Sequence, residues 1–326
     1  MASHKNQHYI PRCYLKAWCD PHTPSKQTPY VWQFSKDGSQ VKKKAPDNIF
    51  AEKDMYTIAE ADGSRNLVLE HGLNGLETQF SVIRDKKLKH RRQIEPAERL
   101  ALCAFVAAMD ARTKARREHT ARDWGKVVEL MDKMHEKAKT FTPEQREQMR
   151  RMAEFEESIR GDAPTLSEEA ARKIAAQPMQ EMLGSMISAL TPLLFMMEVV
   201  IVETSSLPGF ITSDRPCVWF DPEAYKRPPL YQAPALMYET TEISLPISPQ
   251  QTLIFKRKFE ALRGYARIKD KIVDELNRRT RFHAHEFFIV NSNVKKDHWF
   301  DPGTEPDDSW NKVHPNPKSL FENQQE

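Results

Sequence analysis

The spacing of apolar residues changes twice along the chain, near residue 66 and near residue 199. Between these points, outside the charged segment 115–176, an apolar residue recurs every three or four positions, which is the period of an amphipathic helix. After residue 199, short runs of β-branched and aromatic residues are separated by Pro, Gly or Asp, as is typical of strands. The strands expected in this part are 199–202, 210–211, 218–220, 243–247, 252–255 and 287–290.

The apolar patterns predict helices that differ in how much of their surface is buried. The stripe over 69–83 predicts a half-buried helix. Gly72 and Gly75 within it each cost about 1 kcal/mol relative to Ala, so this helix is expected either to bend or to start only after Gly75. Segment 100–109 is apolar on nearly every face and predicts a helix buried all round, with Pro96 in its first turn. Further helices are expected at 10–18, 178–196 and 268–282, and further strands at 30–34 and 55–58.

Residues 115–176 are highly charged and carry few apolar positions. This pattern predicts exposed helices, arranged as a protruding hairpin that turns near 140–143. We therefore expect an α+β fold in which central buried helices pack against a small mixed or antiparallel sheet. In domain terms, 1–114 with 177–294 form one α+β domain, 115–176 is an inserted helical arm, and 295–326 is a C-terminal extension.

Composition excludes several classes of enzyme. Only 10 of the 326 residues are Gly, and they form no G-x-G-x-x-G, G-x-x-x-x-G-K-[ST] or G-x-S-x-G motif. Phosphate loops and nucleophile elbows need Gly where the backbone turns tightly or approaches a ligand. Enzymes built on glycine-rich nucleotide loops and α/β-hydrolases are thus not expected, and neither is a nucleotide cofactor. The net charge of +3 is too small to indicate a nucleic-acid partner by itself.

The sequence also bears on location and on metal chemistry. The longest apolar stretch, 192–202, is interrupted by Glu198 and is shorter than the roughly 18 residues that span a bilayer. The first residues lack the apolar core of a signal peptide, so we expect a soluble cytoplasmic protein with no membrane partner. The four Cys form no C-x-x-C pair. A set of two His and two Cys near the N-terminus does not have the spacing of a structural zinc site.

The densest group of chemically useful side chains is the segment Asn6-Gln7-His8-Tyr9-Ile10-Pro11-Arg12. Because Pro11 fixes the turn, His8 and Arg12 could converge on one pocket, with His8 as an acid, base or ligand and Arg12 as an anion clamp. The alternative is a terminal segment that His8 and Arg12 tie down by hydrogen bonds and ion pairs.

Acidic and basic candidates follow later in the chain. Glu70 and Glu77 lie seven residues apart and would share one face of a straight helix, where paired carboxylates can hold Mg²⁺ or Mn²⁺. Arg112 extends the buried stripe of 100–109, so its charge needs an ion-pair partner, for which these two acids and Asp214 are the candidates, or a bound phosphate. Asp214 follows a strand pattern and could join Glu70 and Glu77 as a third metal ligand or a catalytic acid, or could cap nearby backbone.

Residues 84–92, RDKKLKHRR, form a basic run at the end of an expected helix. Such a run can contact phosphates. A basic run at a helix C-terminus is equally explained as a solvated segment that interacts favourably with the helix dipole.

Several of these segments together resemble a known bacterial family, the domain of unknown function four-two-three-eight. The opening N-Q-H-Y-I-P-R-C-Y-L-K-A-W is similar to the H-Y-[VI]-P-R-x-[YFL]-L signature of that family. Other similar segments are Glu52-Lys53-Asp54-Met55-Tyr56, Glu70 and Glu77, Arg112-Thr113, Thr212-Ser213-Asp214-Arg215-Pro216, Leu245-Pro246-Ile247-Ser248-Pro249 and Asn277. Members commonly have Asn where Arg215 stands. The resemblance implies a bacterial or phage-associated protein, since some members are linked to antiphage defence.

Two functions are compatible with these residues. The first is a metal-dependent phosphodiesterase or nuclease that acts as a defence effector. Glu70, Glu77 and Asp214 would hold Mg²⁺ or Mn²⁺, His8 would be the acid or base, and Arg12 and Arg112 would bind phosphate. The second is a non-catalytic sensor that binds nucleic acid, a nucleotide or a protein, the last through 115–176, with the same charged groups forming a structural ion-pair network. The first requires His8, Glu70, Glu77, Arg112 and Asp214 to meet at one accessible pocket.

Overall fold

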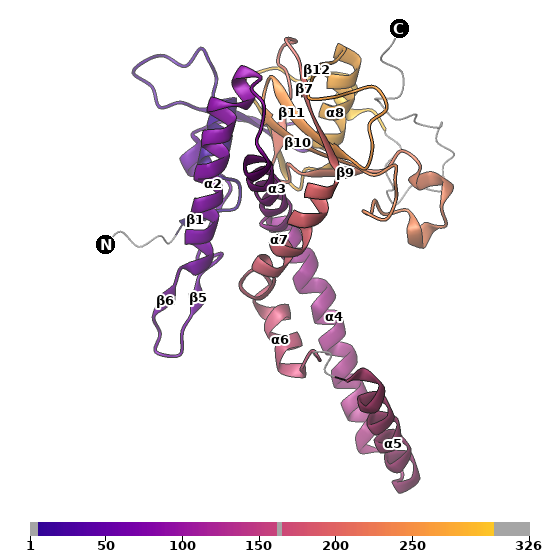
Figure 1. The fold of residues 1–326 in the computed structure, drawn as a ribbon. Coiled ribbons are helices and arrows are strands. Elements are labelled where there is room, and N and C mark those ends of the chain that lie inside the picture. Colours follow the sequence, from indigo (N-terminus) through magenta and orange to yellow (C-terminus); the bar gives the residue numbers. More distant parts are fainter. Residues whose placement is uncertain (1–5, 162–164, 303–326) are drawn as a thin grey trace.

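The structure, a computed structural model, describes residues 6–161 and 165–302, and it is α+β (Figure 1). Helices and strands occur in the order and close to the places that the apolar spacing predicts. The α-helices are α1 (Arg12–Leu15), α2 (Val68–Lys86), α3 (Pro96–Ala111), α4 (Lys114–Lys139), α5 (Pro143–Arg160), α6 (Glu168–Ala176), α7 (Pro178–Met196) and α8 (Asp270–His283). Short 3-10 helices are η1 (Lys16–Trp18), η2 (Pro46–Asn48), η3 (Leu88–His90), η4 (Ala224–Lys226), η5 (Pro229–Tyr231) and η6 (Asp297–Phe300).

The strands form two principal sheets. The larger has the order β12-β7-β11-β10-β9, and all its pairs are antiparallel except β12 with β7. Its strands are β7 (Glu198–Glu203), β9 (Val218–Phe220), β10 (Glu242–Ser248), β11 (Gln251–Lys256) and β12 (Tyr265–Arg267). The second sheet is antiparallel, with the order β3-β2-β13-β8. Its strands are β2 (Val31–Ser35), β3 (Val41–Lys44), β8 (Thr212–Ser213) and β13 (Phe287–Val290).

Two short antiparallel pairs complete the strands. β1 (Asn6–His8) pairs with β4 (Ala51–Lys53), and β5 (Ile58–Ala59) pairs with β6 (Arg65–Asn66). The pairing of His8 with Ala51 joins the N-terminal segment to the strand that follows η2.

Aromatic side chains join the N-terminal segment, the helices and the sheets into one core. The Phe80 ring of α2 stacks on the Phe105 ring of α3, with the centroids 3.8 Å apart. The buried Tyr14 hydroxyl donates to the carbonyl of Pro246 at 2.6 Å, and the Trp18 indole donates to the carbonyl of Phe210 at 2.9 Å. The central helix α3 is buried over most of its length, as its apolar sequence predicts.

Four local predictions need correction. Segment 10–18 is a short α-helix followed by a 3-10 turn rather than one helix. The strand expected at 55–58 is mostly a turn, because Asp54 takes a left-handed conformation (φ 55°), and the strand begins only at Ile58. The strand expected at 210–211 falls two residues later, after the left-handed Gly209 (φ 83°). Helix α2 begins at Val68, before both of its glycines, and Gly72 and Gly75 have open space around them.

Helices α4 and α5 form the protruding hairpin expected from their charge (Figure 1). Thr142 caps α5 and Pro143 starts it, which places the turn where the sequence predicts it. Helix α6 returns along α4 toward α7 and the core. Residues 303–326, most of the expected C-terminal extension, lie outside the described residues. Within the described ranges, no helix combines the length and the apolar character needed to cross a membrane.

Candidate functional site

Arg112 is the centre of the charged group that the sequence singles out. It is the C-terminal capping residue of α3, and only 2% of its surface is exposed because the apolar helix carries it into the core. Its Nη1 donates to Glu77 Oε1 of α2 at 2.8 Å, and its Nη2 donates to the backbone carbonyl of His8. Three segments far apart in sequence are thus held by one buried guanidinium.

Two further polar side chains complete this network. The Tyr56 hydroxyl donates to the Arg112 carbonyl at 3.1 Å, and its ring lies under the Arg112 guanidinium, 5.7 Å from centroid to carbon. Gln7 is fully buried, and its side-chain oxygen accepts the Tyr56 backbone N–H at 2.6 Å. Burial raises the pKa of Tyr56 to about 12, against the opposing charge of Arg112. Burial alone would lower the pKa of Arg112, but Tyr56 and Glu77 outweigh it and the pKa is raised.

His8 lies beside this network, and its surroundings favour the neutral imidazole. Burial lowers its pKa, the nearby Arg12 charge lowers it further, and a backbone hydrogen bond to Asp47 only partly opposes them. Its Nε2 is buried and has no hydrogen-bond partner among the described residues, and the same holds for Nε of Arg112. Two orphaned polar atoms in one network are uncommon in a folded interior.

Arg12 does not converge on Arg112. Its side chain is 58% exposed and forms an ion pair with Asp47 at 3.3 Å, at the surface beside η2. This matches the interpretation of the terminal segment as one tied down by ion pairs, and it leaves Arg12 without a buried anion site.

Asp214 has a backbone-capping role. Its two carboxylate oxygens accept the N–H groups of His285, Glu286 and Phe287 at 2.7, 2.7 and 3.0 Å. Burial raises the pKa of Asp214, although these three hydrogen bonds act in the opposite direction. The residue therefore fixes the start of β13 against β8, through backbone more than 70 residues away in sequence.

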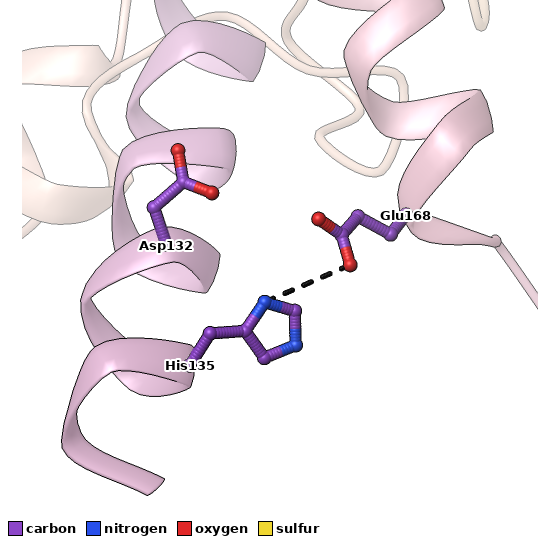
Figure 2. A group of neighbouring side chains, drawn as sticks. All are labelled: Asp132, His135 and Glu168. Atoms are coloured by element: carbon purple, nitrogen blue, oxygen red, sulfur yellow. Dashed lines mark ion pairs between the residues drawn. The ribbon is translucent and has the colours of Figure 1, made fainter. Parts of the chain in front are cut away.

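The three metal ligands expected from the sequence are not brought together. In the ranges 6–161 and 165–302, the one group of His, Cys, Asp or Glu with metal-like spacing is Asp132, His135 and Glu168 (Figure 2). Arg172 already contacts both carboxylates of that group, reaching Glu168 at 2.6 Å, and all three members are partly or fully exposed. A guanidinium thus supplies the positive charge that a metal ion would bring. Glu70 and Glu77 do not form such a group with Asp214.

The basic run at 84–92 lies at a cavity of about 500 Å³. Helix α2 ends at Lys86, the buried Leu88 anchors the 3-10 turn η3, and Arg91 takes a left-handed conformation (φ 52°). This sharp reversal turns the basic side chains toward η1 and toward the ends of β7, β10 and β12. The lining residues are Lys16, Ala17, Arg84, Asp85, Lys89, Arg91, Glu203, Thr204, Ser248, Gln250, Gln251 and Arg267.

The cavity lining carries five cations and two carboxylates, and the carboxylates are already engaged. Glu203 accepts Arg91 at 2.7 Å and the Gln251 amide at 2.9 Å. Asp85 pairs with its neighbour Arg84 at 2.9 Å. This leaves three lining cations, Lys16, Lys89 and Arg267, with no ion pair to a carboxylate in the described part of the chain.

Sequence reasoning missed residues in both places. Gln7 lies next to His8, and Tyr56 ends the Glu52–Tyr56 segment. Nothing in their spacing along the chain shows that the Gln7 and Tyr56 residues meet. Lys16 and Arg267 are isolated basic residues in a chain with 49 Lys and Arg. Only the basic run at 84–92 carried a signal for this cavity.

Comparison with known proteins gives a family. No curated protein and no solved structure matches the chain. One family model matches residues 6–293, which covers the opening signature and every charged residue discussed above. The chain belongs to the family described as Protein of unknown function (DUF4238).

Proposed function

We propose that this protein is a non-catalytic binding module for a small phosphate ester of nucleotide size, held in the cavity beside η3. The observation that carries the proposal is the charge of that cavity, where five cations face two carboxylates that are already paired. A cluster of unpaired cations in a concave site favours an anion with more than one charge, and a phosphate ester is the common biological case.

The volume and chemistry of the lining narrow the ligand class. About 500 Å³ lies within the usual range of small-molecule sites and suits a ligand of nucleotide size. No aromatic side chain lines the cavity, so recognition rests on phosphate rather than on base stacking. Hydroxyl and amide groups from Thr204, Ser248 and Gln250 stand among the cations and can orient phosphate oxygens. Side chains rather than a glycine-rich loop would hold the phosphates, in keeping with the low Gly content.

The other charged group supports binding rather than turnover. Arg112 is committed to Glu77 and to the His8 carbonyl, and Asp214 is committed to three backbone N–H groups. Residues engaged in this way stabilise the fold, since a buried charge that loses its partner is costly. In this account the His8–Glu77–Arg112–Tyr56 network is the rigid frame that supports α2 and so the cavity at its end.

A metal-dependent phosphodiesterase acting in antiphage defence is the second candidate function. One specific observation favours it: His8 Nε2 and Arg112 Nε are both buried and unpartnered, so a bound water or phosphate oxygen would satisfy them. In this candidate Mg²⁺ or Mn²⁺ would have to bind Glu70 and Glu77 with little help from Asp214.

Calorimetric titration with ATP and with inorganic pyrophosphate, at low and at physiological salt, tests the binding proposal. Binding should weaken as salt rises, because the contacts are ionic. Lys16→Glu with Lys89→Glu should weaken binding at least tenfold, since each reversal turns an attraction into a repulsion. Lys42→Glu with Lys258→Glu is the matched control, because both lysines are exposed and lie outside the lining.

The same samples separate the two candidate functions. After prolonged incubation with Mg²⁺ or Mn²⁺, chromatography should recover ATP unchanged, and His8→Ala should bind it as tightly as wild type. Cleavage of ATP or of an oligonucleotide that is lost in His8→Ala would instead establish the phosphodiesterase. Equal binding by the pocket variant and the control variant would refute the cavity as the ligand site.

A further inference from the structure

Helix α3 and the large sheet enclose a second cavity, of about 200 Å³, which shares no lining residue with the cavity beside η3. Arg99, Leu102 and Cys103 of α3 line it. They are three and four positions apart, so they stand on one side of the helix. Leu102 and Cys103 are buried in the main core, which places this cavity inside the fold rather than on its surface.

The sheet gives the cavity an apolar floor. Val199 and Ile201 of β7 pair with Phe255 and Leu253 of β11, so these alternate residues of both strands face the same side of the sheet. Ile201, Leu253 and Phe255 are at most 3% exposed. An apolar cavity of about 150 Å³ binds benzene, so this one suits a ring or a chain of roughly six to eight carbons.

Arg99 is the charged group of this cavity. Among the described residues of the lining, it alone is ionised at neutral pH, and none is a carboxylate. Its Nη2 donates to the backbone carbonyls of Phe195, at 3.0 Å, and Met197, and its guanidinium lies 5.0 Å from the Phe195 ring centroid. Its Nε is buried and has no acceptor in the ranges that the structure describes. A buried N–H without an acceptor is costly, so a ligand that accepts from it would be stabilised there.

The surroundings of Arg99 favour an anionic acceptor. Burial raises the pKa of Cys103 to about 11 and the Arg99 charge opposes this rise, so the positive charge acts on the cavity wall. The protonated thiol does not compensate that charge. Glu98, which also acts on the lining residue Tyr265, is paired with Lys87 at 3.4 Å and accepts the N–H of the residue that caps α3. The guanidinium of Arg99 is therefore left with carbonyl acceptors and no carboxylate in the described part of the chain.

The segment between η3 and α3 forms the mouth of the cavity. The Tyr265 hydroxyl of β12 donates to the carbonyl of Arg92 at 2.8 Å, which ties this segment to the edge of the sheet. The next two residues, the exposed Gln93 and the half-buried Ile94, both line the cavity. A ligand can therefore enter beside Gln93 without separating α3 from the sheet.

We propose that this cavity binds a small monocarboxylate with an apolar tail, of the size of a medium-chain fatty acid. The tail lies on the apolar floor of β7 and β11, and the carboxylate accepts from Arg99. The proposal does not rest on the phosphate site, because the two cavities are lined by different residues.

Calorimetric titration of the full chain with sodium octanoate below its micelle concentration, and with 1-octanol, tests the proposal. Octanoate should bind with one-to-one stoichiometry and about tenfold more tightly than octanol, because a charge-assisted hydrogen bond is stronger than a neutral one. Arg99→Gln should remove this preference by weakening octanoate alone. Lys16→Glu with Lys89→Glu is the control for binding in the other cavity, and it should bind octanoate as wild type does.

Variants that fill the cavity test its location. Val199→Phe places a larger side chain on the floor and should abolish octanoate binding while ATP binding is kept. Val41→Phe is the matched control, because it is also a strand valine but lies outside the lining. Ile94→Trp fills the cavity from its mouth and replaces Val199→Phe if that variant does not fold, as judged by its melting temperature.

Several outcomes would overturn the proposal. Wild type that does not bind octanoate would do so, as would octanol that binds as tightly as octanoate. Octanoate binding that persists in a folded filling variant would place the ligand elsewhere. Loss of octanoate binding in the Lys16 and Lys89 variant would assign it to the cavity beside η3. If Arg99→Gln does not fold, the comparison of octanoate with octanol in wild type still decides whether a carboxylate is preferred.

Discussion

Removal of the Glu77 carboxylate tests whether the charged network is structural. Arg112 is 2% exposed and Glu77 is its one carboxylate partner within the described ranges, at 2.8 Å. Glu77→Ala leaves a guanidinium buried with only the His8 carbonyl and the Tyr56 ring to compensate it. Breaking a buried ion pair in this way costs roughly 3–5 kcal/mol. Because the Glu77 side chain is 19% exposed, water can reach part of the gap, and we expect about 3 kcal/mol.

The expected loss converts to a measurable change in melting temperature. Unfolding entropy is about 2 cal/mol/K per residue near 60 °C, so about 3 kcal/mol corresponds to roughly 4 °C for a chain of 326 residues. Differential scanning calorimetry gives this value directly. Glu136→Ala is the matched control, because it removes a carboxylate from an exposed pair with Lys139 and should leave the melting temperature nearly unchanged.

A double variant sharpens the test. Arg112→Met with Glu77→Gln removes both charges and should be less destabilised than the sum of the single changes, since neither group is left as an uncompensated charge. If the melting temperature of Glu77→Ala equals that of the Glu136→Ala control, the network does not stabilise the fold. If Glu77→Ala keeps its melting temperature but loses an activity of the wild type, the catalytic interpretation is the better one.

Three further predictions rest on single residues. Asp214→Ala leaves three backbone N–H groups without the buried carboxylate that accepts them and should cost several kcal/mol in denaturant unfolding, while ATP binding in the cavity is kept in the variant that remains folded. Gly209→Ala should destabilise the chain by more than 1 kcal/mol in the same measurement, because its φ is 83° and an added Cβ would meet the carbonyl of Pro249. Burial, with the nearby Arg215 and Lys36 charges, lowers the pKa of His283 to about 3. The unfolded chain then binds one more proton than the native chain between pH 6.5 and 3, so stability falls with acidification by up to about 1.4 kcal/mol per pH unit. His283→Asn should flatten the slope of melting temperature against pH between 5 and 6.5, and an unchanged slope would show that His283 titrates normally.

Much of the fold follows from local patterns. Pro96 starts α3, Thr142 and Pro143 start α5, and the apolar run at 100–109 becomes the most buried helix, because propensity, capping and burial agree there. The missed boundaries at Met55 and Phe210 lie beside Asp54 and Gly209, whose left-handed backbone conformations depend on tertiary contacts. Periodicity carries no information about such turns.

The candidate site was predictable only in part. That Arg112 needs a partner follows from its place on an apolar stripe, and Glu77 was among the acids named for it. That Asp214 binds the backbone of 285–287 depends on strand pairing between β8 and β13 across more than 70 residues. The cavity likewise gathers Lys16, Lys89 and Arg267 from three distant segments. Tertiary packing brings such distant residues together, and no regular spacing of residues in the sequence indicates it.

The position of a bound phosphate tests the central claim most directly. A crystal structure of the protein with ATP would show where the phosphate oxygens lie. Our account predicts them in the cavity beside η3, within hydrogen-bonding distance of Lys16 and Lys89, with His8 and Arg112 unchanged. Phosphate oxygens bound instead to His8 Nε2 and Arg112 would contradict the account and would identify the His8–Arg112 group as the functional site.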